Sequence, residues 1–388
     1  MKNRVIIIFD HDIIGYPPTL SLINILLSLD KEVVFLGQYS DDESKAEFEK
    51  RGVQFLNVVY HPNYKIKNGI LRKLDILMSL RKYQKEFFKI VDGFEFREDD
   101  LIWFIFSNKA VYMDTFLHDK DYIVQFYEFV DANMGGKYKA FYPAYDPSKL
   151  LQGAKKVVHC EYNRACIMNG MYGVKGKLNI LPNKPYISDE QFQNIPADIQ
   201  AFFDDIKKKI RGRKAILYQG IFNSNERRLE EFCQSMEILS DDYVFIAMGN
   251  GDYWNVLKER YVSDKYIFIP FIKPPYHLLV TQLANIGVLT YLPVRRSFAD
   301  VINPLYCAPN KVYEYTKFGK PIICNDIPAL RSIVEKFDCG GIVDQPMTPE
   351  GIARTIGSIS NKYKKLAEGA VNYYDSIDMV SIVSDIIG

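Results

Sequence analysis

The stretch 307–326, CAPNKVYEYTKFGKPIICND, places a lysine and a glutamate three residues apart near the start of a short expected helix. Lys311 and Glu314 would therefore share one face of that helix. A cation near a helix N-terminus is disfavoured by the helix dipole unless an anion lies there, which predicts a bound phosphate beside Lys311. Glu314, one turn deeper, could accept hydrogen bonds from a ribose diol. The alternative interpretation is an ordinary surface Lys–Glu pair.

Two glycines that follow expected strands form a second candidate. Gly220 lies in YQGIFNSNERRLEEF, where Arg227 opens the next helix, and Gly249 lies in AMGNGDYW. A glycine here lets backbone amides approach a ligand, and a helix start with an arginine favours an anion. The alternatives are an ordinary turn with a solvated arginine pair and, at Gly249, a plain tight turn. No third glycine completes a dinucleotide-binding fingerprint.

Polar residues at the end of the first expected strand form a third candidate. Asp10, His11 and Asp12 lie where a loop begins, so they could touch an acceptor hydroxyl, with loop solvation as the competing interpretation. None of the five histidines is paired at metal-ligand spacing, and no Cys/His cluster indicates zinc. The sequence also contains no Walker loop and no G-x-S-x-G motif. We therefore expect no metal site.

The segment 64–91 is unusually basic. It carries eight lysines and arginines against two acids, Asp75 and Glu86, and its Leu, Ile, Met and Phe residues recur at helical spacing. This pattern is typical of a helix that contacts an anionic membrane surface at its periphery. The alternative is an amphipathic helix that packs on the first sheet and keeps a solvated basic face.

Continuous apolar runs predict the elements that must position these residues. In the first half the expected strands are 4–10, 32–37, 53–59, 101–106, 122–129 and 155–160. After a proline-containing break at 181–200 they are 215–220, 243–249, 266–271, 285–292, 321–326 and 340–344. Helical patterns separate most of them, which predicts an α/β fold of two Rossmann-like domains. Ligands then lie beyond the carboxyl ends of the strands, and the cleft between two facing domains is the expected site.

Composition limits the class of protein and its surroundings. The chain of 388 residues has a formal net charge of +1, which argues against bulk attraction to nucleic acid. The six cysteines contain no C-x-x-C pair, as expected for reduced thiols in the cytoplasm. The N-terminal apolar run is short and meets Asp10 at once, so we expect no signal peptide. The longest apolar helix candidate, 20–29, is too short to span a bilayer.

Taken together, these stretches resemble the GT-B glycosyltransferases, in particular the retaining family-four type that builds bacterial surface polysaccharides. The resemblance covers nearly the whole chain. NPLYCAPNKVYEYTKFGKPIICND is similar to a donor-site signature, YQGIFNSNERRLEEF to the glycine loop and basic helix start, and CEYNRACIMNGMYGVKGKLNILPNKPY to the end of the N-terminal domain. It implies a GT-B fold of two Rossmann-like domains facing across a cleft. The implied parts are an acceptor domain at 1–184, a nucleotide-sugar donor domain at 185–365 and a C-terminal helix at 366–388 that packs back on the N-terminal domain.

The resemblance also implies roles for single residues. Arg227 and Lys311 would contact the donor diphosphate and act catalytically, Asn303 would lie near the sugar as a third catalytic residue, and Glu314 would bind the ribose hydroxyls. The other implied donor-binding positions are Gly220, Gly249, Phe271, Ile272 and Asn310. The implied acceptor-binding positions are His11, Asp12, Gly15 and Glu128.

The activity implied is transfer of a sugar from a nucleotide sugar to a glycan or lipid-linked acceptor, with retention and without a metal or other cofactor. Fixed cations and helix starts can stabilise the leaving diphosphate, and the departing phosphate can itself take the acceptor proton. One departure from the family pattern is Tyr306, which stands where many members carry a second glutamate. Two alternatives remain: a nucleotide-sugar epimerase, which needs acid and base groups that the sequence does not show, and a non-catalytic module that binds a nucleotide sugar or a partner enzyme.

Overall fold

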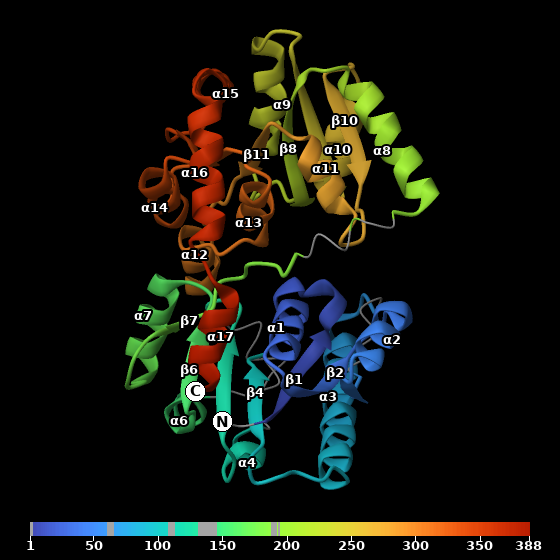
Figure 1. Cartoon of the computed structure of the whole chain (residues 1–388), viewed down its shortest axis with the longest axis vertical. Coiled ribbons are helices and arrows are strands. Elements are labelled where there is room, and N and C mark those ends of the chain that lie inside the picture. The colour runs from blue at the N-terminus through green and yellow to red at the C-terminus, as the bar shows by residue number, and fades with distance from the viewer. Residues whose placement is uncertain (1–2, 60–65, 108–112, 131–145, 188–191, 193–194) are drawn as a thin grey trace. The chain divides into compact units, whose positions relative to one another are not determined.

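The computed structural model describes residues 3–388 except 60–65, 108–112, 131–145, 188–191 and 193–194 (Figure 1). The chain divides into two compact units. Unit 1 comprises Met1–Tyr186, Ser297–Ala299 and Met379–Gly388. Unit 2 comprises Ile187–Arg296 and Asp300–Asp378.

Unit 1, in its described part, contains one parallel sheet. Its strands are β1 (Arg4–Asp12), β2 (Glu32–Gln38), β3 (Gln54–Asn57), β4 (Leu101–Ile105), β5 (Tyr122–Phe126), β6 (Lys156–His159) and β7 (Asn179–Ile180). They lie in the order β3-β2-β1-β4-β5-β6-β7. The order reverses between β1 and β4, and the loops after these strands are where a ligand of such a sheet is expected.

The helices of unit 1 connect these strands and cover the sheet. They are η1 (Ile13–Gly15), α1 (Pro17–Ser28), α2 (Asp42–Lys50), α3 (Gly69–Asp92), α4 (Met113–Leu117), α6 (Ser148–Gly153), α7 (Tyr162–Tyr172) and α17 (Met379–Ile387). Val383 and Ile386 of α17 share one core cluster with Leu22 and Leu26 of α1. The last helix of the chain is therefore part of unit 1.

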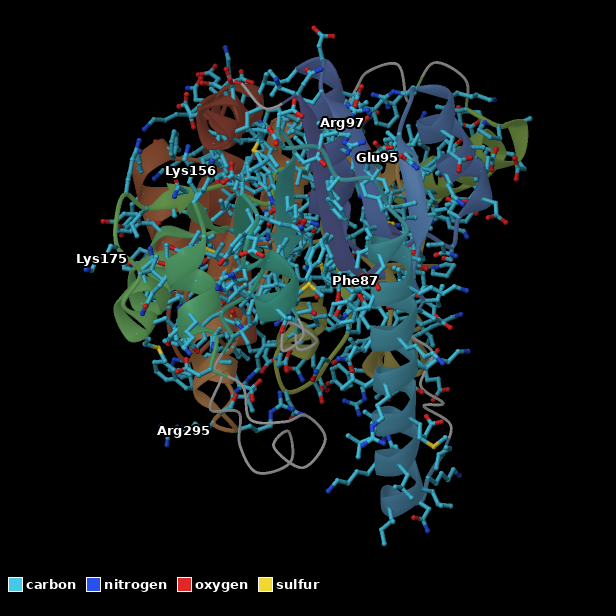
Figure 2. The ribbon with its side chains drawn as sticks, turned by 90° about the horizontal axis from the view of Figure 1, so that it is seen from below. Phe87, Glu95, Arg97, Lys156, Lys175 and Arg295 are labelled. Carbon is cyan, nitrogen blue, oxygen red and sulfur yellow. The ribbon has the colours of Figure 1, made fainter. Side chains whose placement is uncertain are left out.

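Helix α3 is buried along one face only. Its side chains Ile76, Leu80, Tyr83, Phe87 and Val91, three or four residues apart, are all buried. Asn68 begins the helix, because its side-chain oxygen accepts hydrogen bonds from the amides of residues 70 and 71 at 3.0 and 3.2 Å. Figure 2 shows Phe87 beside the sheet of unit 1 and the opposite end of α3 standing apart from the other helices and strands of that unit.

Unit 2 contains a second parallel sheet. Its strands are β8 (Lys214–Ile221), β9 (Tyr243–Asn250), β10 (Tyr266–Pro270), β11 (Ile286–Leu289), β12 (Ile322–Asn325) and β13 (Gly340–Val343), in the order β10-β9-β8-β11-β12-β13. Successive residues of β8 enter different cores: Ile216 joins one cluster and Leu217 the other. A strand with apolar neighbours on both faces is continuously apolar, which is why these strands could be predicted.

The helices of unit 2 lie on the two faces of this sheet. They are α8 (Ala197–Ile210), α9 (Leu229–Ile238), α10 (Asp252–Arg260), α11 (His277–Leu283), α12 (Phe298–Leu305), α13 (Asn310–Lys317), α14 (Pro328–Phe337), α15 (Pro349–Asn361) and α16 (Tyr363–Asp375). Tyr313 of α13 and Tyr373 of α16 stack at 5.7 Å between ring centres. The stretch 366–378 thus stays with unit 2, and the chain changes unit at Met379 rather than at residue 366.

No helix in the described part of the chain combines the length and the apolarity that a membrane span requires.

Candidate functional site

The carboxyl ends of β8 and β9 meet at a pair of glycines. Gly220 is the register partner of Gly249, and both have positive φ, 132° and 149°. A Cβ on Gly249 would lie 1.8 Å from the carbonyl oxygen of Gly220, and one on Gly220 would lie 3.0 Å from the Nζ of Lys311. Side chains are therefore excluded at both positions, and the lysine packs directly against the backbone of β8.

Lys311, in the first turn of α13, points its ammonium group at two tyrosines. Its Nζ lies 4.4 Å from the ring centre of Tyr218 and 5.6 Å from that of Tyr291. The lysine forms no ion pair with any other residue that the structure describes. Burial is the main cause that lowers the pKa of Lys311 to about 7, and the positive charge of Arg227 is the second. The negative charge of Glu314 opposes this shift.

Arg227 lies over the ring of Tyr291, one of the two tyrosines that Lys311 faces. Its guanidinium carbon is 4.2 Å from the ring centre of Tyr291, a cation–π distance. The guanidinium donates to the carbonyl oxygen of Glu226 at 2.9 Å, whereas the Glu226 carboxylate is 3.9 Å away and also pairs with Arg296 at 2.8 Å. The structure therefore brings together the two predicted cations, Arg227 and Lys311, while the nearest carboxylate to Arg227 is shared with Arg296.

A cavity adjoins Arg227, although Lys311 does not line it. It has a volume of about 580 Å³ and is lined by Arg227 together with Ser224, Asn225 and Arg228 from the turn before α9, and by residues of α9 itself. Glu230 and Glu231 of α9 also line this cavity, and Arg228 pairs with Glu231 at 2.5 Å. Its lining therefore carries both signs of charge, and Arg227 with Lys311, rather than the cavity as a whole, indicates the site for an anion.

Glu314 is buried, and its carboxylate contacts side chains of the protein interior. The carboxylate is 6% exposed, accepts a hydrogen bond from Gln219 at 2.5 Å, and lies 3.3 Å from the Nε2 of His277. Thr281 in turn donates to the side-chain oxygen of Gln219 at 2.8 Å. The alternative of an ordinary surface Lys–Glu pair is therefore wrong, because both side chains face the end of the sheet.

The charge on Glu314 is maintained by these partners. Burial by itself would raise the pKa of the carboxyl group, but His277, the hydrogen bond from Gln219, and Lys311 together outweigh burial and lower it. Glu314 is an anion held in place next to Lys311, and its remaining lone pairs are what a ribose diol would have to use.

The other predicted donor-site residues lie in unit 2 at scattered depths. Asn310 is the first residue of α13, whose start receives no side-chain cap from Pro309. Phe271 follows β10 and is 62% exposed, whereas Ile272 is partly buried against the core. Asn303 lies in α12 and is partly buried. Of the predicted donor-site residues, the structure places Arg227, Lys311, Gly220, Gly249 and Glu314 close to one another.

The predicted acceptor residues lie in unit 1, at the ends of β1 and β5. The Nδ1 of His11 is 2.6 Å from a carboxylate oxygen of the buried Asp10, whose other oxygen accepts a hydrogen bond from Ser107. The imidazole lies against Phe9 and Tyr16, with ring centres 5.2 and 5.4 Å away. This pairing holds the imidazole in one orientation.

Asp12, Gly15 and Glu128 differ from His11 in their surroundings. The Asp12 carboxylate accepts hydrogen bonds from the backbone amides of Ile14 and Ser40 at 3.3 and 3.2 Å, so it orders the loop. Gly15 ends η1. Glu128 is exposed after β5, and its negative charge adds to the burial that raises the pKa of Tyr16.

Several residues of the site are not predicted by the sequence. Tyr218, Tyr291, Gln219 and His277 shape the surroundings of Lys311 and Glu314, yet no local pattern marks them for binding. The one available signal is Gln219, a polar residue inside the apolar run AILYQG. His277 is, in the sequence, one of five histidines that show no metal-ligand spacing. Among the residues that the structure describes, no group of three or more His, Cys, Asp or Glu side chains could hold a metal ion.

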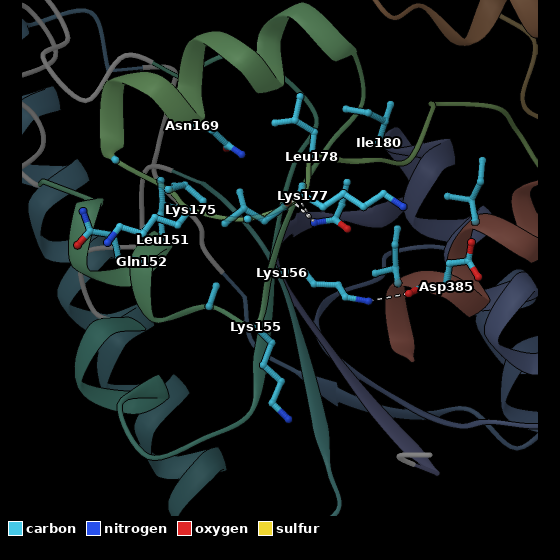
Figure 3. A pocket seen from close by; sticks show the side chains of 18 residues that line it. Leu151, Gln152, Lys155, Lys156, Asn169, Lys175, Lys177, Leu178, Ile180 and Asp385 are labelled. Atoms are coloured by element: carbon cyan, nitrogen blue, oxygen red, sulfur yellow. Dashed lines mark hydrogen bonds between the residues drawn. The ribbon is translucent and has the colours of Figure 1, made fainter.

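A second cavity in unit 1, of about 730 Å³, contains none of the predicted site residues (Figure 3). Lysines line it, but two of them have structural partners. Lys156 donates to the backbone oxygen of Asp385 near the end of α17 at 2.6 Å, and Lys155 pairs with Asp121 at 2.5 Å. Positive side chains at a helix C-terminus satisfy its last carbonyl groups.

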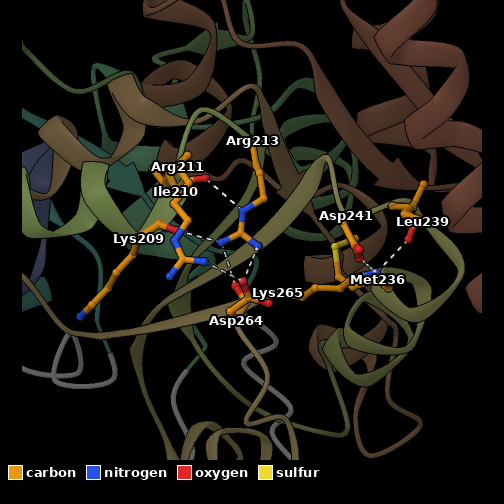
Figure 4. Close-up of polar contacts among 9 residues, drawn as sticks. All are labelled: Lys209, Ile210, Arg211, Arg213, Met236, Leu239, Asp241, Asp264 and Lys265. Carbon is orange, nitrogen blue, oxygen red and sulfur yellow. Dashed lines mark hydrogen bonds and ion pairs between the residues drawn. The ribbon is translucent and has the colours of Figure 1, made fainter.

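Arg213 and Lys265 of unit 2 likewise donate to backbone carbonyl groups at helix C-termini (Figure 4). Arg213 donates to the backbone oxygens of Lys209 and Ile210 at the end of α8, at 2.8 and 3.0 Å. Lys265 donates to those of Met236 and Leu239 at the end of α9, at 3.0 and 2.9 Å. These cations stabilise helix ends, in contrast to Lys311 and Arg227.

Comparison with known proteins rests on structure alone, since no protein-family model and no curated protein sequence matches the chain. Alr3699/HepE of Anabaena, solved in complex with UDP-glucose, is similar with a TM-score of 0.64 and 13% identity over 99% of this chain and 98% of that one. WaaG, a glycosyltransferase involved in lipopolysaccharide biosynthesis, is similar with a TM-score of 0.59 and 12% identity over 98% of both chains.

A third similar structure is the sucrose-phosphate synthase of Thermosynechococcus elongatus, with a TM-score of 0.66 and 13% identity over 99% of this chain and 97% of that one. The chain has the GT-B fold. The predicted fold class, with two parallel-sheet Rossmann-like units, is thereby confirmed.

Proposed function

We propose that this GT-B protein is a glycosyltransferase that takes a sugar from a nucleotide-sugar donor bound to unit 2. The observation that carries the proposal is the placement of Lys311 and Arg227 on the ring of Tyr291, beside Gly220 and at the carboxyl end of a parallel sheet. The carboxylates nearest to these cations are shared with other partners: Glu226 also pairs with Arg296, and Glu314 is held by Gln219 and His277. A diphosphate would supply the further negative charge that two adjacent cations attract. HepE, which has the same fold, was solved with UDP-glucose.

In the proposed reaction, the two cations lie next to the leaving diphosphate, where negative charge develops. When the bond between the sugar and the diphosphate breaks, the leaving group gains negative charge, which the forked donors of Arg227 and the ammonium of Lys311 stabilise. Two fixed cations supply the charge that a metal ion supplies in other transferases, so the proposal includes no metal and no further cofactor. Glu314 positions the nucleoside through the ribose hydroxyls.

The proposal further specifies a hexose as the transferred sugar and retention of configuration at its anomeric carbon. A bond forms between that carbon and the acceptor oxygen as the bond to phosphate breaks, and the acceptor proton passes to a departing phosphate oxygen. Asn303, in α12 of unit 2, is proposed to contact the sugar.

Unit 1 is proposed to bind the acceptor, a glycan or a lipid-linked glycan of cytoplasmic polysaccharide synthesis. The ordered imidazole of His11 and the exposed Glu128 offer polar contacts, and Tyr16 offers an aromatic face next to them. WaaG, a fold neighbour, is involved in lipopolysaccharide biosynthesis, which supports an acceptor of this kind.

The test is incubation of the protein with UDP-, GDP- and dTDP-sugars, with and without glycan acceptors, followed by chromatography of the nucleotides and sugars. Free nucleotide diphosphate that appears only with acceptor, and is lost in Arg227→Ala, supports the proposal. Interconversion of the donor sugar without acceptor would indicate an epimerase. Binding without either product would indicate a non-catalytic module. The anomeric coupling constant of the product, measured by NMR, decides between retention and inversion.

A further inference from the structure

The N-terminal end of α3 exposes a group of large apolar side chains. Ile70, Leu71, Leu74 and Met78 are 74%, 56%, 51% and 70% exposed. Single exposed apolar residues are common on protein surfaces, but four within nine residues of one helix are not scattered singly. We call these four residues the α3 tip.

The α3 tip continues into a basic strip on the same side of the helix. At 3.6 residues per turn, Ile70, Leu74 and Met78 lie one above another, and the same line continues through Arg81 and Lys85. Lys82 and Lys89 flank it, and these four basic residues are all exposed. We call Arg81, Lys82, Lys85 and Lys89 the α3 basic strip.

The opposite side of α3 is occupied by unit 1. The buried residues Ile76, Leu80, Tyr83, Phe87 and Val91 lie roughly half a turn away from the tip and the strip. The helix therefore cannot rotate to hide its exposed apolar residues without removing Tyr83 and Phe87 from the core. Figure 2 shows how the tip end of the helix stands apart from the other elements of unit 1.

We propose that the α3 tip inserts into the interface of an anionic lipid bilayer while the α3 basic strip contacts its headgroups. This interaction is independent of the proposed transfer reaction. An anionic bilayer is negative at its surface and apolar just beneath, and α3 presents charge and apolar surface in the corresponding order along one face.

Charge complementarity favours a bilayer over a protein partner. Helix α3 contains six basic and three acidic residues, and Lys82 is the only member of the basic strip with a carboxylate near it, Glu86 at 3.8 Å, in the part of the chain that the structure describes. An apolar end next to exposed lysines suits a partner that is both apolar and negative over a wide area, which a lipid surface supplies without shape matching.

The experiment is co-sedimentation of the full chain with sucrose-loaded vesicles of phosphatidylglycerol and phosphatidylcholine, and with vesicles of phosphatidylcholine alone. We expect binding to the anionic vesicles at low salt, at least tenfold weaker binding to phosphatidylcholine, and a decrease as salt rises. Failure to sediment with anionic vesicles at low salt would overturn the proposal, as would equal binding to both kinds of vesicle.

Variants separate the two parts of the surface. Leu71→Gln with Leu74→Gln should weaken binding at least tenfold at every salt concentration, because each inserted leucine contributes roughly tenfold. Arg81→Gln with Lys85→Gln should weaken it several-fold at low salt only. Val262→Gln, at an apolar residue of unit 2 that is 83% exposed, is the matched control and should bind like the unaltered protein. A tip variant that also binds like the unaltered protein would refute insertion.

Oxidation of methionine by peroxide gives a test that needs no substitution. Met78 in the tip and Met171 in α7 are both exposed, at 70% and 46%. Anionic vesicles should slow oxidation of Met78, read by mass spectrometry of its peptide, and leave Met171 unchanged. An unchanged rate at Met78 under conditions of vesicle binding would show that another surface binds the lipid.

Discussion

Lys311 and Arg227 lie on one aromatic ring, with the ammonium 5.6 Å and the guanidinium carbon 4.2 Å from the ring centre of Tyr291. Two cations held this close repel each other. The repulsion adds to burial in lowering the pKa of Lys311 to about 7. An anion bound between them would remove this penalty, so ligand binding and protonation of the lysine must be linked.

The first prediction concerns proton uptake. Above pH 7 most of the free protein has a neutral Lys311, and a bound diphosphate raises its pKa, so binding at pH 8 takes up close to one proton. Isothermal titration of UDP in buffers of different ionisation enthalpy measures this number. At pH 6 the lysine is already charged, and the uptake should vanish.

The control for proton uptake is Lys311→Arg, which stays charged at both pH values. It should bind UDP with no uptake at pH 8. Equal uptake in this variant and in the unaltered protein would show that another group takes the proton.

The second prediction concerns stability as a function of pH. The pKa of Lys311 is about 7 in the folded state and close to the ordinary lysine value of 10.5 in the unfolded chain. Between these values the unfolded state binds more protons, so this residue makes the unfolding free energy rise with pH across that window, with no effect below it. The rise should be roughly 2 kcal/mol, less than the full shift because the side chain keeps some exposure.

Lys311→Met isolates this contribution, because it keeps the length of the side chain and removes the charge. Urea unfolding at pH 7 and pH 9 should show a smaller difference in unfolding free energy in the variant, which should also be the more stable protein at pH 7. A variant that is less stable at pH 7 would show that the ammonium stabilises the free protein.

The fold could be predicted because both sheets are parallel and buried on two faces. Strands such as β1, β4 and β9 are then uninterrupted apolar runs, visible without any knowledge of their partners. The exceptions are short or terminal elements. Among the described residues, the two-residue β7 pairs with Val158 and His159 and has no pattern of its own. Helix α17 packs on unit 1 as the family resemblance implies for the end of the chain, although no local pattern indicates it.

The site could be predicted only where local chemistry is unusual. Gly220 is a glycine directly after an apolar strand run, and Lys311 is a positive charge at a helix start, so each is noticeable in the sequence alone. His277 gives no such signal, and Gln219 gives only its polarity inside an apolar run. They matter because the fold brings Gln219 to Glu314 across 95 positions of sequence, and which face of a strand or helix meets which neighbour cannot be read from spacing.

The third prediction separates binding from packing at Glu314. Because this carboxylate pairs with Gln219 and His277 in the interior, Glu314→Ala should lower the unfolding free energy by about 2–3 kcal/mol as well as weaken nucleotide binding. Glu314→Gln keeps the shape and should cost about 1 kcal/mol. Thermal unfolding and UDP titration of both variants provide the measurement. Unchanged stability in Glu314→Ala would mean that the interior contacts are replaced by water.

The fourth prediction concerns the close approach of β8 and β9. In Gly249→Ala the new Cβ would lie 1.8 Å from the carbonyl oxygen of Gly220, at a φ of 149° that an L-residue rarely adopts. The strand ends must separate, so we expect a loss of unfolding free energy of about 3 kcal/mol and weaker UDP binding, because Lys311 packs against the same backbone.

Gly357→Ala is the matched control for Gly249→Ala. Gly357 lies inside α15, where a Cβ would have no atom within 4 Å beyond its own stretch of the helix, and alanine is the better helix former there. This variant should gain about 0.5–1 kcal/mol and bind UDP normally. If urea unfolding gave both variants the same small change, the contact between Gly220 and Gly249 would not restrict the strand ends, and the role assigned to the glycine pair would fail.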